Sequence, residues 1–212
     1  DYPKQQAISV GSDLEYSLVE AGSLKLICGS DLLESVAQRL ELEEYKVVAS
    51  CQGAALENIV AQHPFYGRSI PVLLGDHVTT DAGTGCVHTA PDHGLDDFAV
   101  SNKYGISSLT NLGNGVFKND DELFAGQHVY KVDEAVNQVL TDHGRLMSCG
   151  KITHSYAHCW RTKTPLIYRA TPQWFISMDK NKLRDTALKS IDKTIFYPAQ
   201  GQTRLRSMIE TR

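Results

Sequence analysis

Alternating and continuous apolar positions near the start of the chain predict short β-strands separated by turns. The strands are expected at residues 7–10, 15–20 and 23–28. Apolar residues then recur at helical spacing from residue 32 to residue 40. Ser30 and Asp31 stand directly before this stripe, so we expect a helix here with one of them as its N-cap.

The same patterns predict further elements along the rest of the chain. Strands are expected at residues 45–51, 70–74, 146–149, 165–170 and 174–177. Helices are expected at residues 95–104, 129–142, 179–191 and 203–211, and a loop-rich stretch at 107–128. We therefore expect an α+β fold. Residues 1–178 form a mainly antiparallel, barrel-like sheet with flanking helices, and residues 179–212 form a helical connector.

Composition places the chain among globular proteins. Of its 212 residues, 42% are apolar, which is enough for a packed core. No apolar run is long enough to cross a bilayer, and the start has neither the basic nor the apolar part of a signal peptide. The five cysteines include no C-x-x-C pair, which favours the reducing cytoplasm over a disulfide framework. Without an initiator Met, we expect a piece of a longer protein.

Charge is distributed unevenly between the two parts of the chain. Residues 1–150 hold 9 Lys and Arg against 21 Asp and Glu, whereas residues 151–212 hold 12 against 4. A basic end of this kind is suited to phosphate, as in nucleic acid. A solvated charged face is the alternative interpretation of the same pattern.

Residues 75–98 form the most unusual segment of the sequence. Two strand-like pieces flank the turn at 83–85, where two glycines let the backbone come close to a ligand. His88, His93 and the acidic pair at 96–97 follow within a few residues. Together these groups could grip an amine, orient a water molecule or bind a metal. Each taken singly also has an ordinary structural interpretation, such as a carboxylate at a helix start.

Other chemistries are less well supported by the sequence. His88 and His93 are five residues apart, which is not the spacing of paired helical zinc ligands. The His and Cys residues at 154–159 lack the second arm that a zinc site needs. Cys86 has no positioned partner that would make it a nucleophile, and no Gly-x-Ser-x-Gly elbow is present. The chain also has neither a phosphate-binding loop nor a dinucleotide fingerprint.

Two blocks of sequence carry a family resemblance. The block Gly83-Thr84-Gly85-Cys86-Val87-His88-Thr89-Ala90-Pro91, followed by Asp96-Asp97-Phe98, resembles the editing-site segment of bacterial isoleucyl-tRNA synthetases. The block Cys159-Trp160-Arg161-Thr162-Lys163-Thr164-Pro165, followed by the segment at 169–175, resembles the passage by which that family returns from its inserted editing domain to the catalytic body. The first block also fits valyl relatives, whereas the second favours the isoleucyl branch.

The resemblance implies an editing domain of a tRNA ligase. In this family the synthetic site rejects valine poorly, because valine and isoleucine differ by one methylene. A second, smaller pocket hydrolyses valyl-tRNA(Ile) and, in some cases, valyl-adenylate. The implied partners are the 3′ end of tRNA(Ile), the valine ester or adenylate, and the rest of the synthetase, with no membrane. The alternative is a tRNA-binding fragment without hydrolytic activity of its own.

The family's functional residues map onto named positions of this chain. Asp97 matches the aspartate that holds the substrate α-ammonium by a charge-assisted bond. His88 matches the histidine that shapes the pocket and excludes the larger side chain. Both are assigned as catalytic. The expected substrate-binding residues are Gly83, Thr84, Gly85, Thr89, His93 and Tyr156, the last near the terminal adenosine. Hydrolysis is expected to use a bound water and the substrate ribose hydroxyl, with no covalent intermediate and no metal.

The chain departs from the family pattern at several points. The threonine-rich strand that usually precedes the segment at 1–9 is missing, which implies an incomplete site. Asp92 stands where glycine is common, placing an extra carboxylate near the pocket mouth. Thr162 replaces the second Cys that some members carry, which makes a zinc knuckle doubtful. ATP-binding signatures are absent, so we expect no cofactor here, and ATP and Mg²⁺ only in the parent's catalytic domain.

Overall fold

The chain divides into two compact units, which are described separately. The computed structural model describes residues 5–108, 113–151 and 153–211. One unit is Asp1–Ala170 and the other is Thr171–Arg212. The domain boundary expected after residue 178 stays a prediction.

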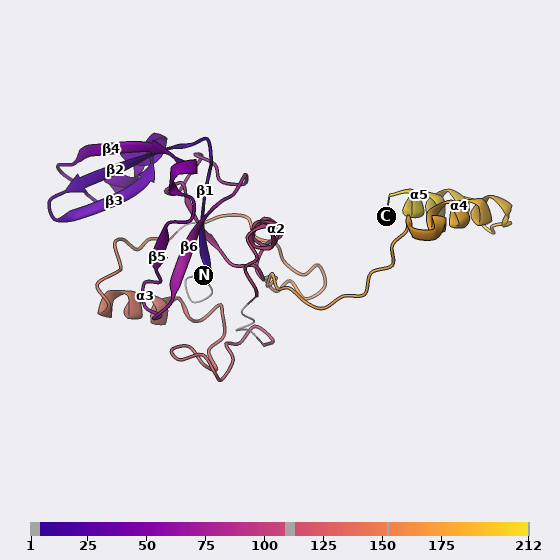
Figure 1. Ribbon diagram of the computed structural model, residues 1–212. Helices are drawn as coiled ribbons and strands as arrows, with labels where there is room; N and C mark the ends of the chain where they lie inside the picture. Colours follow the sequence, from indigo (N-terminus) through magenta and orange to yellow (C-terminus); the bar gives the residue numbers. More distant parts are fainter. Residues whose placement is uncertain (1–4, 109–112, 152, 212) are drawn as a thin grey trace. The chain divides into compact units, whose positions relative to one another are not determined.

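A four-stranded sheet lies at the centre of the first unit (Figure 1). Its strands, in spatial order, are β5 (Val60–Gln62), β6 (Ser69–Leu74), β1 (Ala7–Val10) and β7 (Cys86–Thr89). Strands β1 and β6 are parallel, whereas β1 with β7 and β5 with β6 are antiparallel. The sheet is therefore mixed, and β7 is an edge strand among the described residues.

A second sheet of three strands is antiparallel throughout (Figure 1). Strand β2 (Glu15–Ala21) lies between β3 (Leu24–Gly29) and β4 (Lys46–Gln52). The tight turn from β2 to β3 contains Gly22 at a φ of 60°, a conformation that glycine adopts without strain.

The expected barrel-like sheet is wrong. The described residues form two separate sheets, one mixed and one antiparallel, and no closed barrel. The reason is that the chain leaves β1, builds the three-stranded sheet, and returns to place β6 parallel to β1. Each sheet keeps its edges, so strand pairing does not close on itself. A sequence pattern shows which side chains are buried, but does not show which strands pair.

Strands expected in the C-terminal third are also absent from the described residues. Residues 146–149, 165–170 and 174–177 form no strand, and the nearest feature is one isolated bridge between His158 and Pro165. Trp174 and Phe175 are almost fully exposed, at 101% and 87%. A β-rich composition alone does not form a strand, because a strand needs a partner.

The helices of the first unit follow the predicted stripes with shifted starts. Helix α1 (Leu33–Arg39) is preceded by the 3₁₀ turn η2 (Ser30–Leu32), and neither has a side-chain cap. The expected N-cap is therefore wrong, and the Ser30 hydroxyl instead lies 2.8 Å from that of Ser17. Helix α2 (Leu95–Lys103) is confirmed, and α3 (Asp133–Asp142) starts later than residue 129. A further 3₁₀ turn, η3, spans Gly53–Leu56.

The second unit is a pair of helices with a short 3₁₀ start. The turn η4 (Lys180–Lys182) leads into α4 (Leu183–Lys193), which packs with α5 (Gln200–Glu210). Arg184 links the two ends by donating to the carbonyl of Ile209 at 2.5 Å and pairing with Asp179 at 3.2 Å. None of the helices in the described ranges is both long enough and apolar enough for a membrane span.

The two faces of the four-stranded sheet have different surroundings. Because side chains alternate along a strand, Ile8 and Cys86 belong to one face, which packs against Tyr16 of β2. We call this the cavity face. Ala7 and Leu73 belong to the other face and pack against Val100 of α2. We call this the helix face, and the functional side chains divide between the two.

Candidate active site

The Gly-Thr-Gly turn adopts a backbone that only glycine fits well. Gly83 and Gly85 have φ values of 88° and 75°. A Cβ on Gly85 would lie 3.2 Å from the Gly29 nitrogen and 3.3 Å from Cε1 of Tyr16. A Cβ on Gly83 would meet nothing within 4 Å. Gly85 is therefore required both by conformation and by close approach, whereas Gly83 is required by conformation alone.

Two contacts from the three-stranded sheet hold this turn in place. The Tyr16 hydroxyl donates to the carbonyl of Gly85 at 2.6 Å and accepts from the backbone N–H of Gly11 at 3.0 Å. The N–H of Gly29 donates to the carbonyl of Thr84 at 2.8 Å. The turn is thus fixed by residues that are distant in sequence.

A cavity of about 560 Å³ lies beside the turn on the cavity face. Small-molecule sites commonly measure about 300–1,000 Å³. Two of the predicted site residues, Thr84 and His88, line it, and His88 is paired with Ile8 across β7 and β1. The full lining is Gln5, Ile8, Gln62, Pro64, Ile70, Thr84, Cys86 and His88. It combines an apolar wall with amide, hydroxyl and imidazole groups, which suits a small amphipathic ligand.

Cys86 lines the cavity but is not an activated nucleophile. Burial, with a smaller effect of Cys28, raises the pKa of the Cys86 thiol to about 11. The thiol is therefore protonated near neutral pH, and the thiolate is the reactive form. This agrees with the sequence, which offers no positioned base for Cys86.

Asp97 lies in the first turn of α2, the helix that covers the helix face. It is half-buried and one turn before Val100, but it is not among the described residues that line the cavity. Its carboxylate turns back over Gly94, where a Cβ would lie 2.9 Å from Oδ2. Burial raises the pKa of the Asp97 carboxyl, and His77 partly lowers it. The structure thus places His88 in the cavity lining and Asp97 outside it.

The residues between His88 and Asp97 are anchored inside the first unit. Thr89 is fully buried, and its hydroxyl lies 2.6 Å from that of Ser9 on the helix face. The His93 ring nitrogen Nδ1 lies 2.8 Å from the carbonyl of Tyr168. These two residues stay predicted substrate contacts that the cavity lining does not include.

Asp92 is buried rather than exposed at a pocket mouth. Its exposed fraction is 7%, and its carboxylate accepts a hydrogen bond from the Ser108 hydroxyl. Its backbone carbonyl accepts from the N–H of Ala170 at 2.9 Å. The extra carboxylate therefore ties loops together instead of facing a ligand.

Tyr156 lies outside the cavity lining. Its hydroxyl donates to the carbonyl of Leu166 at 2.9 Å, and the Tyr130 hydroxyl donates to the same carbonyl at 2.6 Å. The Tyr156 side chain is partly exposed, so its ring remains available to a partner. Its expected place near an adenosine stays a prediction.

The turn that follows Cys159 forms hydrogen bonds to its thiol. The hydroxyl of Thr162, the residue that replaces a second Cys, hydrogen-bonds the Cys159 sulfur and, with backbone N–H groups, lowers the pKa of the Cys159 thiol. Within the described ranges, no three His, Cys, Asp or Glu side chains come together in a way that could hold a metal ion.

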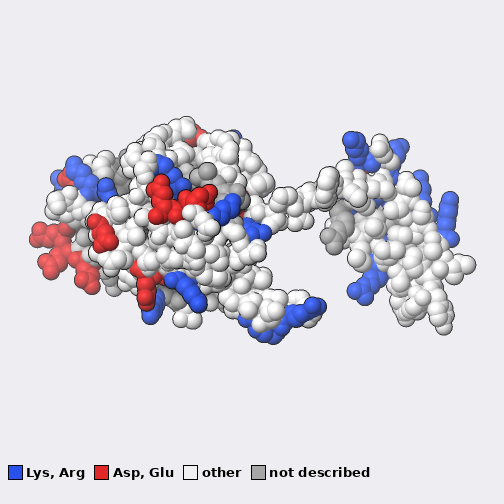
Figure 2. Space-filling view, turned by 90° about the horizontal axis from the view of Figure 1, so that it is seen from below, with Lys and Arg blue, Asp and Glu red and all other residues white. Residues whose placement is uncertain are grey.

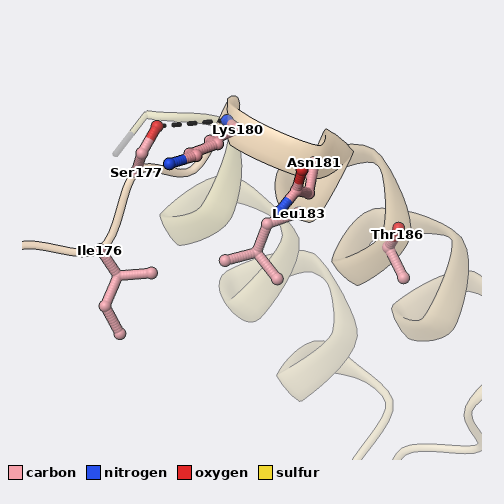
Figure 3. Close-up of a pocket in the computed structure, with 6 residues that line it drawn as sticks. All are labelled: Ile176, Ser177, Lys180, Asn181, Leu183 and Thr186. Atoms are coloured by element: carbon pink, nitrogen blue, oxygen red, sulfur yellow. Dashed lines mark hydrogen bonds between the residues drawn. The ribbon is translucent and has the colours of Figure 1, made fainter.

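The second unit has a hollow of its own, of about 490 Å³ (Figure 3). In this view the Leu183 side chain points toward Ile176, and the Lys180 N–H donates to the Ser177 hydroxyl at 3.1 Å. None of the predicted site residues lines it. Figure 2 shows Lys and Arg side chains, and no acidic ones, on the visible face of this unit. This is the basic character expected of residues 151–212.

Two residues that hold the Gly-Thr-Gly turn were missed from the sequence. Tyr16 and Gly29 hold the turn from another sheet, and nothing in their own strands marks that role.

Comparison with known proteins gives a consistent family. The model of the class I tRNA synthetases for isoleucine, leucine, methionine and valine matches residues 10–212. The chain is 58% identical over 213 residues to the isoleucine–tRNA ligase of Hahella chejuensis, covering 98% of this chain and 23% of that protein. It is 53% identical over 210 residues to that of Saccharophagus degradans, covering 99% and 22%. The chain thus spans less than a quarter of the length of these relatives.

A solved structure is similar in fold. It is described as the crystal structure of GlLeuRS-CP1, and the two share a TM-score of 0.50 and 16% sequence identity. The match covers 68% of this chain and 76% of that one. At this identity the likeness concerns the fold alone.

Proposed function

The chain belongs to the class I tRNA synthetases for isoleucine, leucine, methionine and valine, and on this premise we propose that it is the editing region of an isoleucine-specific member. Its proposed reaction is the hydrolysis of valine esterified to tRNA(Ile), with valyl-adenylate as a second substrate. The supporting observation is one combination: a fold like that of GlLeuRS-CP1 in which a Gly-Thr-Gly turn and His88 line a cavity.

The proposed ligand lies over the end of β7. In the part of the chain that the structure describes, this strand is the edge of its sheet, and the loop after it leads to Asp97 at the start of α2. Thr84 and His88 contact the ligand from the cavity face, and the ionised Asp97 binds its α-ammonium group. His88 limits the size of the side chain that enters.

The proposed chemistry needs no covalent enzyme intermediate. A water molecule adds to the ester carbonyl, the bond from that carbon to the ribose oxygen breaks, and the ribose oxygen takes up a proton. The products are valine and tRNA. A neighbouring ribose hydroxyl assists the water, and the protonated Cys86 thiol takes no part.

The wider activity of such a synthetase is also part of the proposal. Attachment of isoleucine to tRNA would use ATP and Mg²⁺, and the partners would be tRNA(Ile) and the rest of the synthetase.

The test is deacylation of valyl-tRNA(Ile) by the wild-type chain and by Asp97→Ala and His88→Ala variants. Loss of a charge-assisted contact of about 1.5–3 kcal/mol should slow Asp97→Ala roughly 10- to 100-fold. His88→Ala should instead begin to hydrolyse isoleucyl-tRNA(Ile). The exposed neighbour Asp96→Ala is the matched control and should retain the wild-type rate. Undiminished hydrolysis by Asp97→Ala would remove that residue from its role.

A second candidate function is tRNA binding without hydrolysis. The observation that favours it is the excess of Lys and Arg in residues 151–212. Binding of tRNA that weakens steeply with salt, together with no deacylation under any condition, would establish it instead of the first.

A further inference from the structure

We infer that the hairpin at residues 157–166 is a docking surface for single-stranded nucleic acid, on which a base stacks against Trp160 while Arg161 and Lys163 contact phosphates. We call this segment the aromatic hairpin. The inference deepens the proposed function and rests on it only for the identity of the nucleic acid, which would be the 3′ end of tRNA(Ile). Binding of nucleic acid to this surface can be tested without any hydrolysis.

Two backbone hydrogen bonds close the aromatic hairpin. The N–H of Cys159 donates to the carbonyl of Thr164 at 2.8 Å. The N–H of Leu166 donates to the carbonyl of Ala157 at 3.0 Å, nearer the base. The chain therefore reverses its direction at residues 160–163, and these four residues form the tip of the hairpin.

The base of the hairpin is fixed to other parts of the first unit. The hydroxyls of Tyr130 and Tyr156 both donate to the carbonyl of Leu166, at 2.6 Å and 2.9 Å. Just after the hairpin, the guanidinium of Arg169 donates to the carbonyl of Gly113 at 2.6 Å. A segment that is already ordered loses less conformational entropy when a partner binds, so an anchored hairpin is suited to docking.

The tip presents an aromatic ring with a cation on one of its faces. The Trp160 side chain is 76% exposed, and Cζ of Arg161 lies 5.0 Å from the centre of the indole ring. One guanidinium covers only one face of the ring, so the other face is available to a partner. Bases of any kind stack on such a ring, because every base has a π-face. Trp160 is therefore suited to receive an unpaired base.

The sequence around the tip has the charge that phosphates require. Residues 143–178 contain five Lys and Arg, three His and no Asp or Glu. Arg161 and Lys163 are both exposed, and within the described ranges neither of them forms an ion pair. Their charges are thus available to phosphate oxygens, and displacement of counterions from the nucleic acid would add to the affinity.

The combination of one exposed ring and nearby cations favours a single strand over other partners. In a duplex the bases stack on one another, so their faces are closed to a side chain. Unpaired nucleotides expose these faces, and aromatic side chains and Arg are the groups on which they stack. An acidic protein surface would pair with the cations but would not need an open indole face.

The aromatic hairpin is also joined to the loop that links β7 to α2. The N–H of Ala170 donates to the carbonyl of Asp92 at 2.9 Å. In the same loop, the His93 ring nitrogen Nδ1 lies 2.8 Å from the carbonyl of Tyr168. The segment that follows the hairpin therefore contacts the loop that leads to the proposed site, so one nucleic acid could engage both the hairpin and that site.

The first experiment measures stacking on the ring directly. The chain has two tryptophans, so a Trp174→Phe background leaves Trp160 as the single fluorescent indole. A short single-stranded RNA should quench this fluorescence in a saturable way, whereas the same RNA annealed to its complement should quench it less. Fluorescence of Trp160 that does not change with single-stranded RNA, whether or not a labelled RNA binds, would overturn the inference.

The second experiment measures affinity with a labelled single-stranded RNA at several salt concentrations. Trp160→Ala should weaken binding roughly 5- to 150-fold, and Trp160→Phe, which keeps an aromatic ring, should weaken it less. Arg161→Ala and Lys163→Ala should each reduce the salt slope by about 0.7, the value for one phosphate of a single strand.

The matched control for these variants is Lys46→Ala, which removes an exposed cation from β4. It should leave both the affinity and the salt slope unchanged. Circular dichroism checks that each variant is folded, and if Trp160→Ala is not, the comparison of Trp160→Phe with Arg161→Ala decides. Wild-type affinity in the folded Trp160 variants and in Arg161→Ala would overturn the inference.

Deacylation of valyl-tRNA(Ile) separates this inference from the proposed function. Substitutions at the tip should raise KM several-fold with little change in kcat, because the hairpin binds the nucleic acid and does not touch the ester. Loss of RNA binding in the tip variants, together with no deacylation by the wild type, would keep the docking surface and reject the proposed function. Unchanged RNA binding in the tip variants with normal wild-type deacylation would do the reverse.

Discussion

The two faces of the four-stranded sheet differ in what they leave exposed. On the cavity face, His88, Thr84 and Cys86 surround an open space, and the turn beside it is held rigidly by Tyr16. On the helix face, α2 covers the sheet and half-buries the carboxylate of Asp97. The cavity face therefore provides space for a ligand, and the helix face provides a charged group.

This difference assigns a separate physical role to each face. An open space with fixed walls selects a ligand by size, which is a matter of packing. A half-buried carboxylate selects by charge, and it lowers the stability of the fold because its ionised form is poorly solvated. Editing, as proposed, needs both selections at once, and the edge strand β7 is where the two faces meet.

The largest expected loss of stability comes from a substitution in the Gly-Thr-Gly turn beside the cavity. Gly85→Ala combines a positive φ with a close approach to Gly29 and Tyr16, so unfolding free energy should fall by roughly 2–4 kcal/mol. Gly83→Ala is the control, since its φ is also positive but its surroundings are open, and it should lose about 1 kcal/mol. Urea unfolding followed by circular dichroism measures both, and equal losses would show that the close approach is unimportant.

A smaller loss of stability should follow from removing the hydroxyl group that holds the same turn. Tyr16→Phe deletes the hydroxyl that bonds Gly85 and Gly11 and leaves both backbone groups unpaired. The expected loss is about 1–3 kcal/mol of unfolding free energy. Tyr156→Phe also loses one bond to a carbonyl but is partly exposed, so it should change little. A Tyr16→Phe chain as stable as the wild type would contradict the conclusion that the Tyr16 hydroxyl stabilises the turn.

The smallest expected change in unfolding free energy is a gain rather than a loss, and it comes from a substitution on the helix face. The folded-state pKa of Asp97 is raised, so this group favours folding below its ordinary pKa, and that contribution is lost as pH rises through the raised value. Asp97→Asn should therefore be slightly more stable than the wild type at neutral pH. Its advantage should vanish in acid, where Asp97 is protonated. Urea unfolding at several pH values measures the difference, and an Asn variant that is less stable at neutral pH would reject burial as the dominant influence.

Elements with a clear periodic pattern were predictable from the sequence. The strand at Ala7–Val10 and the helix at Leu95–Lys103 formed where the spacing of apolar residues placed them. Each presents one apolar side, so the buried side was predictable although its partner was not. The prediction of a barrel-like sheet was wrong for a different reason. The parallel pairing of β1 with β6 depends on a crossover connection that leaves no mark in the sequence of either strand.

Site residues were predictable only as a segment. The Gly-Thr-Gly turn and His88 do lie together at a cavity, as their closeness in sequence indicated. The division between the faces could not be foreseen, because His88 and Asp97 are separated by a loop whose path depends on Ser108 and Tyr168. The Tyr16 contact joins residues 69 positions apart, a distance over which a single sequence carries no contact information.

The account depends on one ligand reaching both faces, and its most direct test is an NMR titration of the chain with a non-hydrolysable valyl-adenosine. We expect saturable shifts of the His88 ring and of the Asp97 carboxyl with the same apparent Kd, and no such shifts with the isoleucyl analogue. Shifts confined to one of the two side chains, or none in either, would contradict a single site spanning the edge of the sheet.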